Sequence, residues 1–129
     1  MSDENVLIIE DELIIARELE LRLKELGCSV IGIAETGRQA LQVLEIATPD
    51  LVLMDIGLKG TLDGVETATE IRRRWSVPLI YVTAFADENV VRRAQATQPS
   101  GYLVKPFSGE AFRSSVESAL HRDAGNRGI

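Results

Sequence analysis

The sequence predicts an α/β fold in which five parallel strands and five helices alternate in a doubly wound (βα)5 sheet. Three observations carry this prediction: short β-prone runs recur along the chain, segments of helical period separate them, and prolines or capping residues mark the junctions. Four of the five β-prone runs are apolar throughout, which is typical of strands covered by helices on both faces. Right-handed crossovers then place helices on both sides of the sheet.

The β-prone runs and the helical stripes fix the expected elements in chain order. Strands are expected at residues 6–9, 30–34, 51–54, 79–82 and 102–104. The first helix follows the first strand, because apolar residues recur at helical spacing from Ile15 to Leu26 and stop at Gly27. Similar stripes predict helices that include residues 40–47, 65–75, 87–98 and 112–120. The expected N-caps are Thr36, Asp87 and Ser108. Prolines mark the ends of helices before strands at Pro49, Pro78 and Pro99.

The composition indicates one globular domain. The chain has 129 residues, of which 45% are hydrophobic and 26% are charged, as in a domain with a substantial core. We place this domain at residues 1–122. Residues 123–129 have no apolar periodicity, and they are expected either to fray or to begin a linker.

The charge balance argues against direct contact with nucleic acid. The chain has 14 basic and 20 acidic residues and a formal charge of −6, whereas a nucleic-acid binder needs a basic surface. No apolar run approaches the roughly 20 residues that span a bilayer, and the first residues lack the regions of a signal peptide. We therefore expect no membrane insertion and a cytoplasmic location. The single cysteine, Cys28, is expected to be a small buried hydrophobe.

Polar residues of particular kinds follow four of the predicted strands. Ligands of open α/β sheets bind at the carboxyl ends of the strands, so these residues are the candidates for a site. They are Glu10 and Asp11 after the first strand, Asp55 after the third, Thr83 after the fourth and Lys105 after the fifth. Three carboxylates, a hydroxyl and an ammonium are therefore expected at one edge of the sheet.

This set of side chains favours phosphoryl chemistry with a divalent metal. Crowded carboxylates repel one another unless a cation joins them, and hard oxygen ligands suit Mg²⁺. With Mg²⁺ and Lys105 supplying positive charge, the site can accept a phosphoryl group on an Asp nucleophile. The product is an aspartyl phosphate.

Four motifs in this order make the chain similar to the receiver domains of two-component response regulators (CheY-like). The motifs are IIEDE at the first strand, LVLMDIGL at the third, YVTAF at the fourth and GYLVKPF at the fifth, and the resemblance covers residues 5–122. It implies the flavodoxin-like strand order 2-1-3-4-5. It also implies that Asp55 is the phospho-acceptor, that Asp11 ligates Mg²⁺ with Glu10 acting beside it through water, and that the Gly57 carbonyl is a further ligand.

The resemblance assigns roles to the other strand-end residues as well. Lys105 and the Ala84 backbone are expected to bind the phosphoryl oxygens, together with the hydroxyl of Thr83. Thr83 and Tyr102 form the expected switch pair, in which the Tyr102 rotamer follows Thr83. The Lys105-Pro106 peptide bond is expected to be cis. Asp63-Gly64, which opens the third helix, comes one residue later than in most receivers, and the loop before it lacks the usual proline.

The implied function is signalling by phosphorylation, with Mg²⁺ as cofactor and Mn²⁺ as a substitute. The phosphodonor would be a sensor histidine kinase, a phosphotransfer protein or a small phosphodonor. The domain would catalyse its own phosphorylation and dephosphorylation, without being a conventional enzyme. Its output would pass through the surface of the fourth helix, fifth strand and last helix to an output domain, an effector or a second copy of the chain. We place Arg92, Arg93 and Arg113 on that surface.

Three other functions fit the sequence less well. A haloacid-dehalogenase-like phosphatase needs a second Asp two residues after the nucleophile, where this chain has Gly57. A flavodoxin-type nucleotide binder needs phosphate-binding donors in its first loop, where Glu10, Asp11 and Glu12 would repel the ligand. A receiver-like interaction module that no longer accepts phosphate is disfavoured by the intact set of acids, Thr83 and Lys105.

Overall fold

The computed structural model describes residues 4–58, 63–84 and 88–127, the last six of these by their backbone only. Within this part of the chain, five parallel strands form one sheet in the order β2-β1-β3-β4-β5, as the resemblance implied. The strands are β1 (Asn5–Ile9), β2 (Ser29–Ala34), β3 (Leu51–Met54), β4 (Leu79–Thr83) and β5 (Gly101–Val104). Each agrees with its expected range to within a residue at either end.

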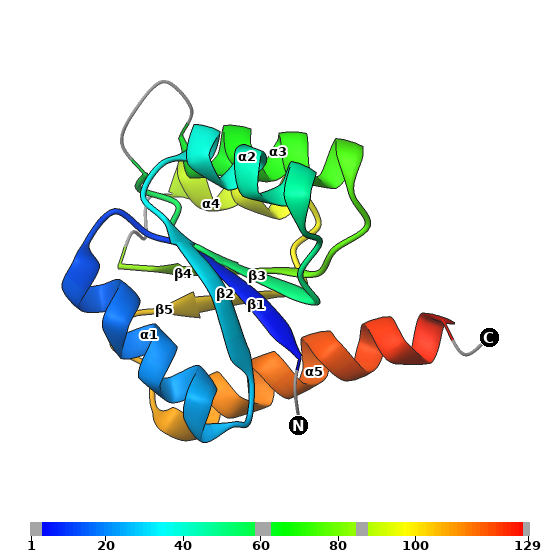
Figure 1. Cartoon of the computed structure of the whole chain (residues 1–129). Helices are drawn as coiled ribbons and strands as arrows, with labels where there is room; N and C mark the ends of the chain where they lie inside the picture. Colours follow the sequence, from blue (N-terminus) through cyan, green and yellow to red (C-terminus); the bar gives the residue numbers. More distant parts are fainter. Residues whose placement is uncertain (1–3, 59–62, 85–87, 128–129) are drawn as a thin grey trace.

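Helices cover both faces of this sheet (Figure 1). They are α1 (Leu13–Glu25), α2 (Gly37–Ile46), α3 (Gly64–Arg74), α4 (Glu88–Ala96) and α5 (Gly109–Arg127). The helices α2, α3 and α4 pack on one face, and α1 and α5 pack on the other. The predicted α/β class and doubly wound architecture are therefore confirmed.

The central strands are buried on both sides, as their continuous apolar runs predict. Along β1, Leu7 and Ile9 belong to the core under α2, α3 and α4, whereas Val6 and Ile8 belong to the core under α1 and α5. All four side chains are fully buried. Alternation along one strand thus supplies both cores.

Side chains cap the helices at two of the three expected positions. The Thr36 hydroxyl accepts a hydrogen bond from the Gln39 amide, and the Ser108 hydroxyl accepts one from the Ala111 amide at 3.0 Å. The third expected N-cap, Asp87, lies outside the described residues.

Gly27 ends α1 in a left-handed conformation with φ 85°. The Gly27 amide donates to the Lys24 carbonyl and the Cys28 amide to the Leu23 carbonyl, which is the hydrogen-bond pattern of a Schellman motif. The chain then turns into β2, and Cys28 is buried as expected.

The last helix is longer than the sequence suggests. α5 continues to Arg127, through the segment that was expected to fray or to begin a linker, and its end extends past the sheet (Figure 1). Apolar periodicity reports burial, whereas a helix that has already formed propagates through backbone hydrogen bonds alone. In the described part of the chain, no helix combines the length and apolar character needed to cross a membrane.

Candidate functional site

Strand register brings the predicted site residues together at one edge of the sheet. Ile9 of β1 pairs with Met54 of β3, so the residues that follow them, Glu10 and Asp55, emerge side by side. On the other side of the site, the Lys105 amide donates to the Thr83 carbonyl at 2.9 Å. The convergence expected from the sequence is therefore present in the fold.

Glu10, Asp11 and Asp55 form an acidic cluster. One carboxylate oxygen from each lies within 4.8 Å of the others. Glu10 is buried, and the other two are half-buried. Glu10 Oε1 and Asp11 Oδ2 are buried without a hydrogen-bond partner among the described residues. Buried oxygens of this kind are costly unless a cation or a donor satisfies them, so the residues present fit a hard divalent cation such as Mg²⁺.

The electrostatics of Glu10 show how strongly the cluster needs positive charge. The pKa of Glu10 is raised to about 7, chiefly by burial and also by the neighbouring Asp55 carboxylate. The Glu12 amide, which donates to Glu10 at 3.1 Å, and the Lys105 ammonium both act in the opposite direction. Lys105 Nζ lies 3.5 Å from Glu10 Oε1. A single ammonium therefore does not offset the crowding of three carboxyl groups.

The backbone around Asp55 is held by the start of α3. The Gly57 amide donates to Asp55 Oδ1 at 3.1 Å, and the Gly64 amide donates to the Ile56 carbonyl at 3.2 Å. A Cβ on Gly64 would lie 2.7 Å from both the Cα and the carbonyl oxygen of Ile56, so only glycine permits this approach. Asp63 caps α3 in a capping box with Glu66. Asp63-Gly64 opens α3 as expected, whereas the capping box with Glu66 and the close approach of Gly64 to Ile56 were not predicted.

Thr83 and Tyr102 lie on the same face of the sheet. Tyr81 pairs with Tyr102 in register, and Thr83 follows Tyr81 by two residues, so the three side chains point to one side. Thr83 is buried at the end of β4, and Tyr102 is half-buried against the core under α2, α3 and α4. The expected cis peptide bond between Lys105 and Pro106 is present.

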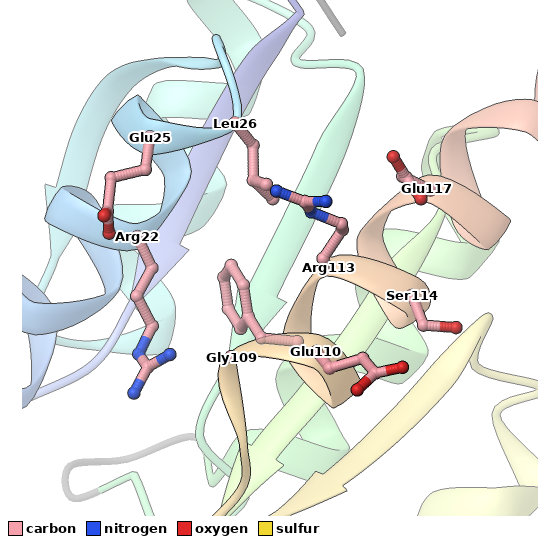
Figure 2. A pocket seen from close by; sticks show the side chains of 9 residues that line it. Arg22, Glu25, Leu26, Gly109, Glu110, Arg113, Ser114 and Glu117 are labelled. Atoms are coloured by element: carbon pink, nitrogen blue, oxygen red, sulfur yellow. The ribbon is translucent and has the colours of Figure 1, made fainter.

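A pocket between α1 and α5 lies away from the acidic cluster. It has a volume of about 620 Å³ and separates α1 from α5 (Figure 2). Arg113 of α5 lines it opposite Leu26 of α1, so Arg113 is not on the surface of α4, β5 and α5 where the sequence analysis placed it. Arg113 and Ser115 flank the buried Phe112 on opposite sides, and Ser115 is the one that approaches Gly101 of β5. Arg93 pairs with Asp63 at 3.4 Å and so faces α3.

Comparison with known proteins identifies the family to which this fold belongs. The family model for the response regulator receiver domain matches residues 6–117. The chain belongs to the response regulator receiver domain family. It is therefore a receiver domain of two-component signalling, a family of signalling domains rather than conventional enzymes.

Two regulatory proteins are similar to this chain over most of its length. The transcriptional regulatory protein PdtaR of Mycobacterium tuberculosis is 38% identical over 117 residues, which cover 91% of this chain and 57% of PdtaR. The phyllosphere-induced regulator PhyR of Methylorubrum extorquens is 32% identical over 89% of this chain and 43% of its own length. The chain thus spans about half the length of these relatives.

Solved receiver structures agree with this assignment. The signal receiver domain of a modulated diguanylate cyclase from Desulfovibrio desulfuricans matches 97% of this chain and 99% of its own length, with a TM-score of 0.91 and 35% identity. The receiver domain of a sensor histidine kinase from Pseudomonas aeruginosa matches 93% of this chain and 99% of its own, with a TM-score of 0.81 and 29% identity. That structure has a magnesium ion coordinated in the active site cleft.

Proposed function

We propose that this receiver accepts a phosphoryl group on Asp55 from a phosphohistidine of a sensor kinase or phosphotransfer protein, or from a small phosphodonor. The observation that carries the proposal is the meeting of Glu10, Asp11 and Asp55 with Lys105 at the carboxyl edge of the sheet. An Asp nucleophile, a cation site and a fixed ammonium are the groups that phosphoryl transfer to a carboxylate requires.

Each group at the edge has a separate task. Glu10, Asp11, Asp55 and the Gly57 carbonyl would hold Mg²⁺, or Mn²⁺ in its place. The bound ion would supply positive charge that offsets the charge on the phosphoryl oxygens. The Asp55 carboxylate attacks phosphorus, the bond from phosphorus to the histidine nitrogen breaks, and that nitrogen keeps the electron pair.

A second group of residues receives the transferred phosphoryl group. The Lys105 ammonium, the Thr83 hydroxyl and the Ala84 amide bind its oxygens. The same residues then serve hydrolysis, by which the domain removes its own phosphoryl group.

The phosphorylated state is read out through Thr83 and Tyr102. A phosphoryl group on Asp55 offers the Thr83 hydroxyl a new acceptor, and Tyr102, on the same face of the sheet, turns into the space that Thr83 leaves. A hydrogen bond contributes only about 0.5 to 1.5 kcal/mol net, so it cannot by itself shift the equilibrium to the activated conformation. Lys105 and the loop after Thr83 must also favour that conformation. The surface of α4, β5 and α5 would then contact an output domain, an effector or a second copy.

The boundaries of the domain belong to the same proposal. We assign residues 1–122 to the receiver and residues 123–129 to a tail or the start of a linker. PdtaR and PhyR are each considerably longer than this chain, which fits a receiver that forms one part of a larger protein. The cytoplasmic location expected from the sequence is also part of this proposal.

Labelling with acetyl phosphate tests the central claim. In the presence of Mg²⁺ the intact protein should gain one phosphoryl group by mass spectrometry, and Asp55→Asn should abolish the gain. Asp50→Asn is the matched control, because Asp50 lies at the opposite end of β3, where it accepts from the Asn5 amide, and it should label normally. Labelling that persists in Asp55→Asn, or in excess chelator, would contradict the proposal.

A further inference from the structure

Arg22 of α1 lies beside the segment that carries Lys105. In Figure 2 its side chain extends from α1 along the cleft toward the start of α5. The guanidinium carbon lies 5.3 Å from the centre of the Phe107 ring and 6.0 Å from the centre of the Phe112 ring. Both distances are in the range of cation–π contacts.

The two rings give Arg22 a fixed partner surface. Phe107 and Phe112 stack at 5.8 Å with an angle of 18° between their planes. Phe112 is fully buried in the core under α1 and α5, so its ring is a fixed support for Phe107. Arg22 thus closes over Phe107 from the side of α1, while Phe112 supports it from α5.

The segment from Lys105 to Gly109 is fixed at both ends. At its start, the Lys105 amide donates to the Thr83 carbonyl. At its end, Ser108 caps α5, and a Cβ on Gly109 would lie 3.4 Å from Arg22 Nη1. Between these points Phe107 is the residue whose side chain packs against the core. The contact with Arg22 therefore acts on the middle of the segment.

Unfilled space beside the segment shows what the contact prevents. A pocket of about 260 Å³ is lined by Ile15, Leu19, Arg22, Lys105 and Phe107, among others. Without Arg22, Phe107 and the stem of Lys105 have room to move into it. The Lys105 ammonium would then leave its place 3.5 Å from Glu10 Oε1.

We propose that Arg22 is a positioning residue for Lys105: it holds Phe107 in place, and the segment in turn keeps the ammonium at the phosphoryl-binding edge. The inference rests on the proposed function, because Lys105 has this task only if the site binds a phosphoryl group. The planar guanidinium suits this role, since it stacks on rings in a way that an ammonium does not.

Two affinities measured on the same protein separate positioning from general damage. Arg22→Ala should weaken the binding of beryllofluoride, a phosphoryl mimic, about threefold to tenfold, which is the range that such contacts account for. Its affinity for Mg²⁺ alone, measured by calorimetry, should not fall, because the acidic cluster does not include Arg22 and a displaced ammonium repels the ion less. Fluorine NMR reports the beryllofluoride complex directly.

Variants on both sides of the contact complete the test. Arg22→Lys should fall between the wild type and Arg22→Ala, and Phe107→Leu should reproduce the loss even if Arg22→Ala proves too unstable. Arg17→Ala is the matched control, since Arg17 pairs with Glu20 on the exposed side of α1. Unchanged beryllofluoride affinity in Arg22→Ala and Phe107→Leu, or an equal loss of both affinities, overturns the inference. A wild type that binds neither Mg²⁺ nor beryllofluoride overturns the proposed function itself.

Discussion

Glu10 occupies an environment that sets it apart from ordinary carboxylates. Its side chain is only 1% exposed, and it lies next to Asp11 and Asp55. Burial raises its pKa from 4.5 to about 7. In the metal-free protein its proton is therefore held to a much higher pH than in the unfolded chain, and folding becomes linked to pH.

The stability of the metal-free protein should fall as pH rises from about 4.5 to about 7. In this range the folded state keeps the proton on Glu10 that the unfolded chain has lost, so stability from this group is complete below 4.5 and is lost through about 7. The full effect is at most about 3 kcal/mol. Urea denaturation in chelator, at several pH values, measures it. Glu10→Gln should flatten this part of the profile, and an identical slope in the variant would contradict the assignment.

Among the elements, the helix α4 is held to the rest of the domain through its C-terminal half. Ala94 is its buried residue, within its second half. Just beyond the helix, the Tyr81 hydroxyl and Thr97 Oγ1 lie 2.7 Å apart in a hydrogen bond, and Gln98 reverses the chain with φ 56°. Arg93 joins α4 to Asp63, the N-cap of α3. The C-terminal end of α4 is thus fixed to β4, and any displacement of α4 should pivot about that end.

A double-mutant cycle between Tyr81 and Thr97 should measure this attachment. Tyr81→Phe and Thr97→Val each lower the free energy of unfolding, and their coupling energy should be about 0.5 to 1.5 kcal/mol, the net value of one hydrogen bond. Amide exchange at Thr97 and Gln98 should quicken in Tyr81→Phe, because the end of α4 loses its link to β4. Strictly additive single effects would show that the hydrogen bond does not hold the helix.

For the molecule as a whole, the acidic cluster links metal binding to folding. A cation that binds only the folded state stabilises it by mass action. Mg²⁺ should therefore raise the melting temperature of the entire domain, although it contacts only one edge of the sheet.

Calorimetry or thermal scanning should show this stabilisation. At a hundredfold excess over Kd, Mg²⁺ contributes about 2.7 kcal/mol, which corresponds to roughly 10 °C in a domain of this size. Asp11→Ala should lose the response, because Asp11 supplies a buried oxygen without another partner among the described residues. Asp50→Asn, at the far end of β3, should keep it. An unchanged metal-dependent shift in Asp11→Ala would exclude Asp11 as a ligand.

The sequence alone determines the layer architecture and the main members of the site. Strands whose residues are apolar without alternation must be covered by helices on both faces of the sheet. The alternation of such strands with amphipathic helices along the chain is consistent with a doubly wound sheet. In such a sheet every carboxyl end lies at one edge. The sequence could therefore predict that Asp55, Thr83 and Lys105 lie at the same edge of the sheet, although they are far apart in the chain. Strand direction alone determines this, because each of them follows a parallel strand.

Only the tertiary structure decides on which side of an element a polar residue lies. Helical period identifies Phe112 as buried, but Arg113 and Ser115 lie on either side of it, and the period alone does not tell which of them meets α1 and which meets β5. The same holds for the acids: Glu10 is buried and Glu12 is exposed, although both belong to one run. The close approach of Gly64 to Ile56 and the contact of Arg22 with Phe107 were likewise not predicted, since both depend on the distance between elements, which is set by packing and not by local pattern.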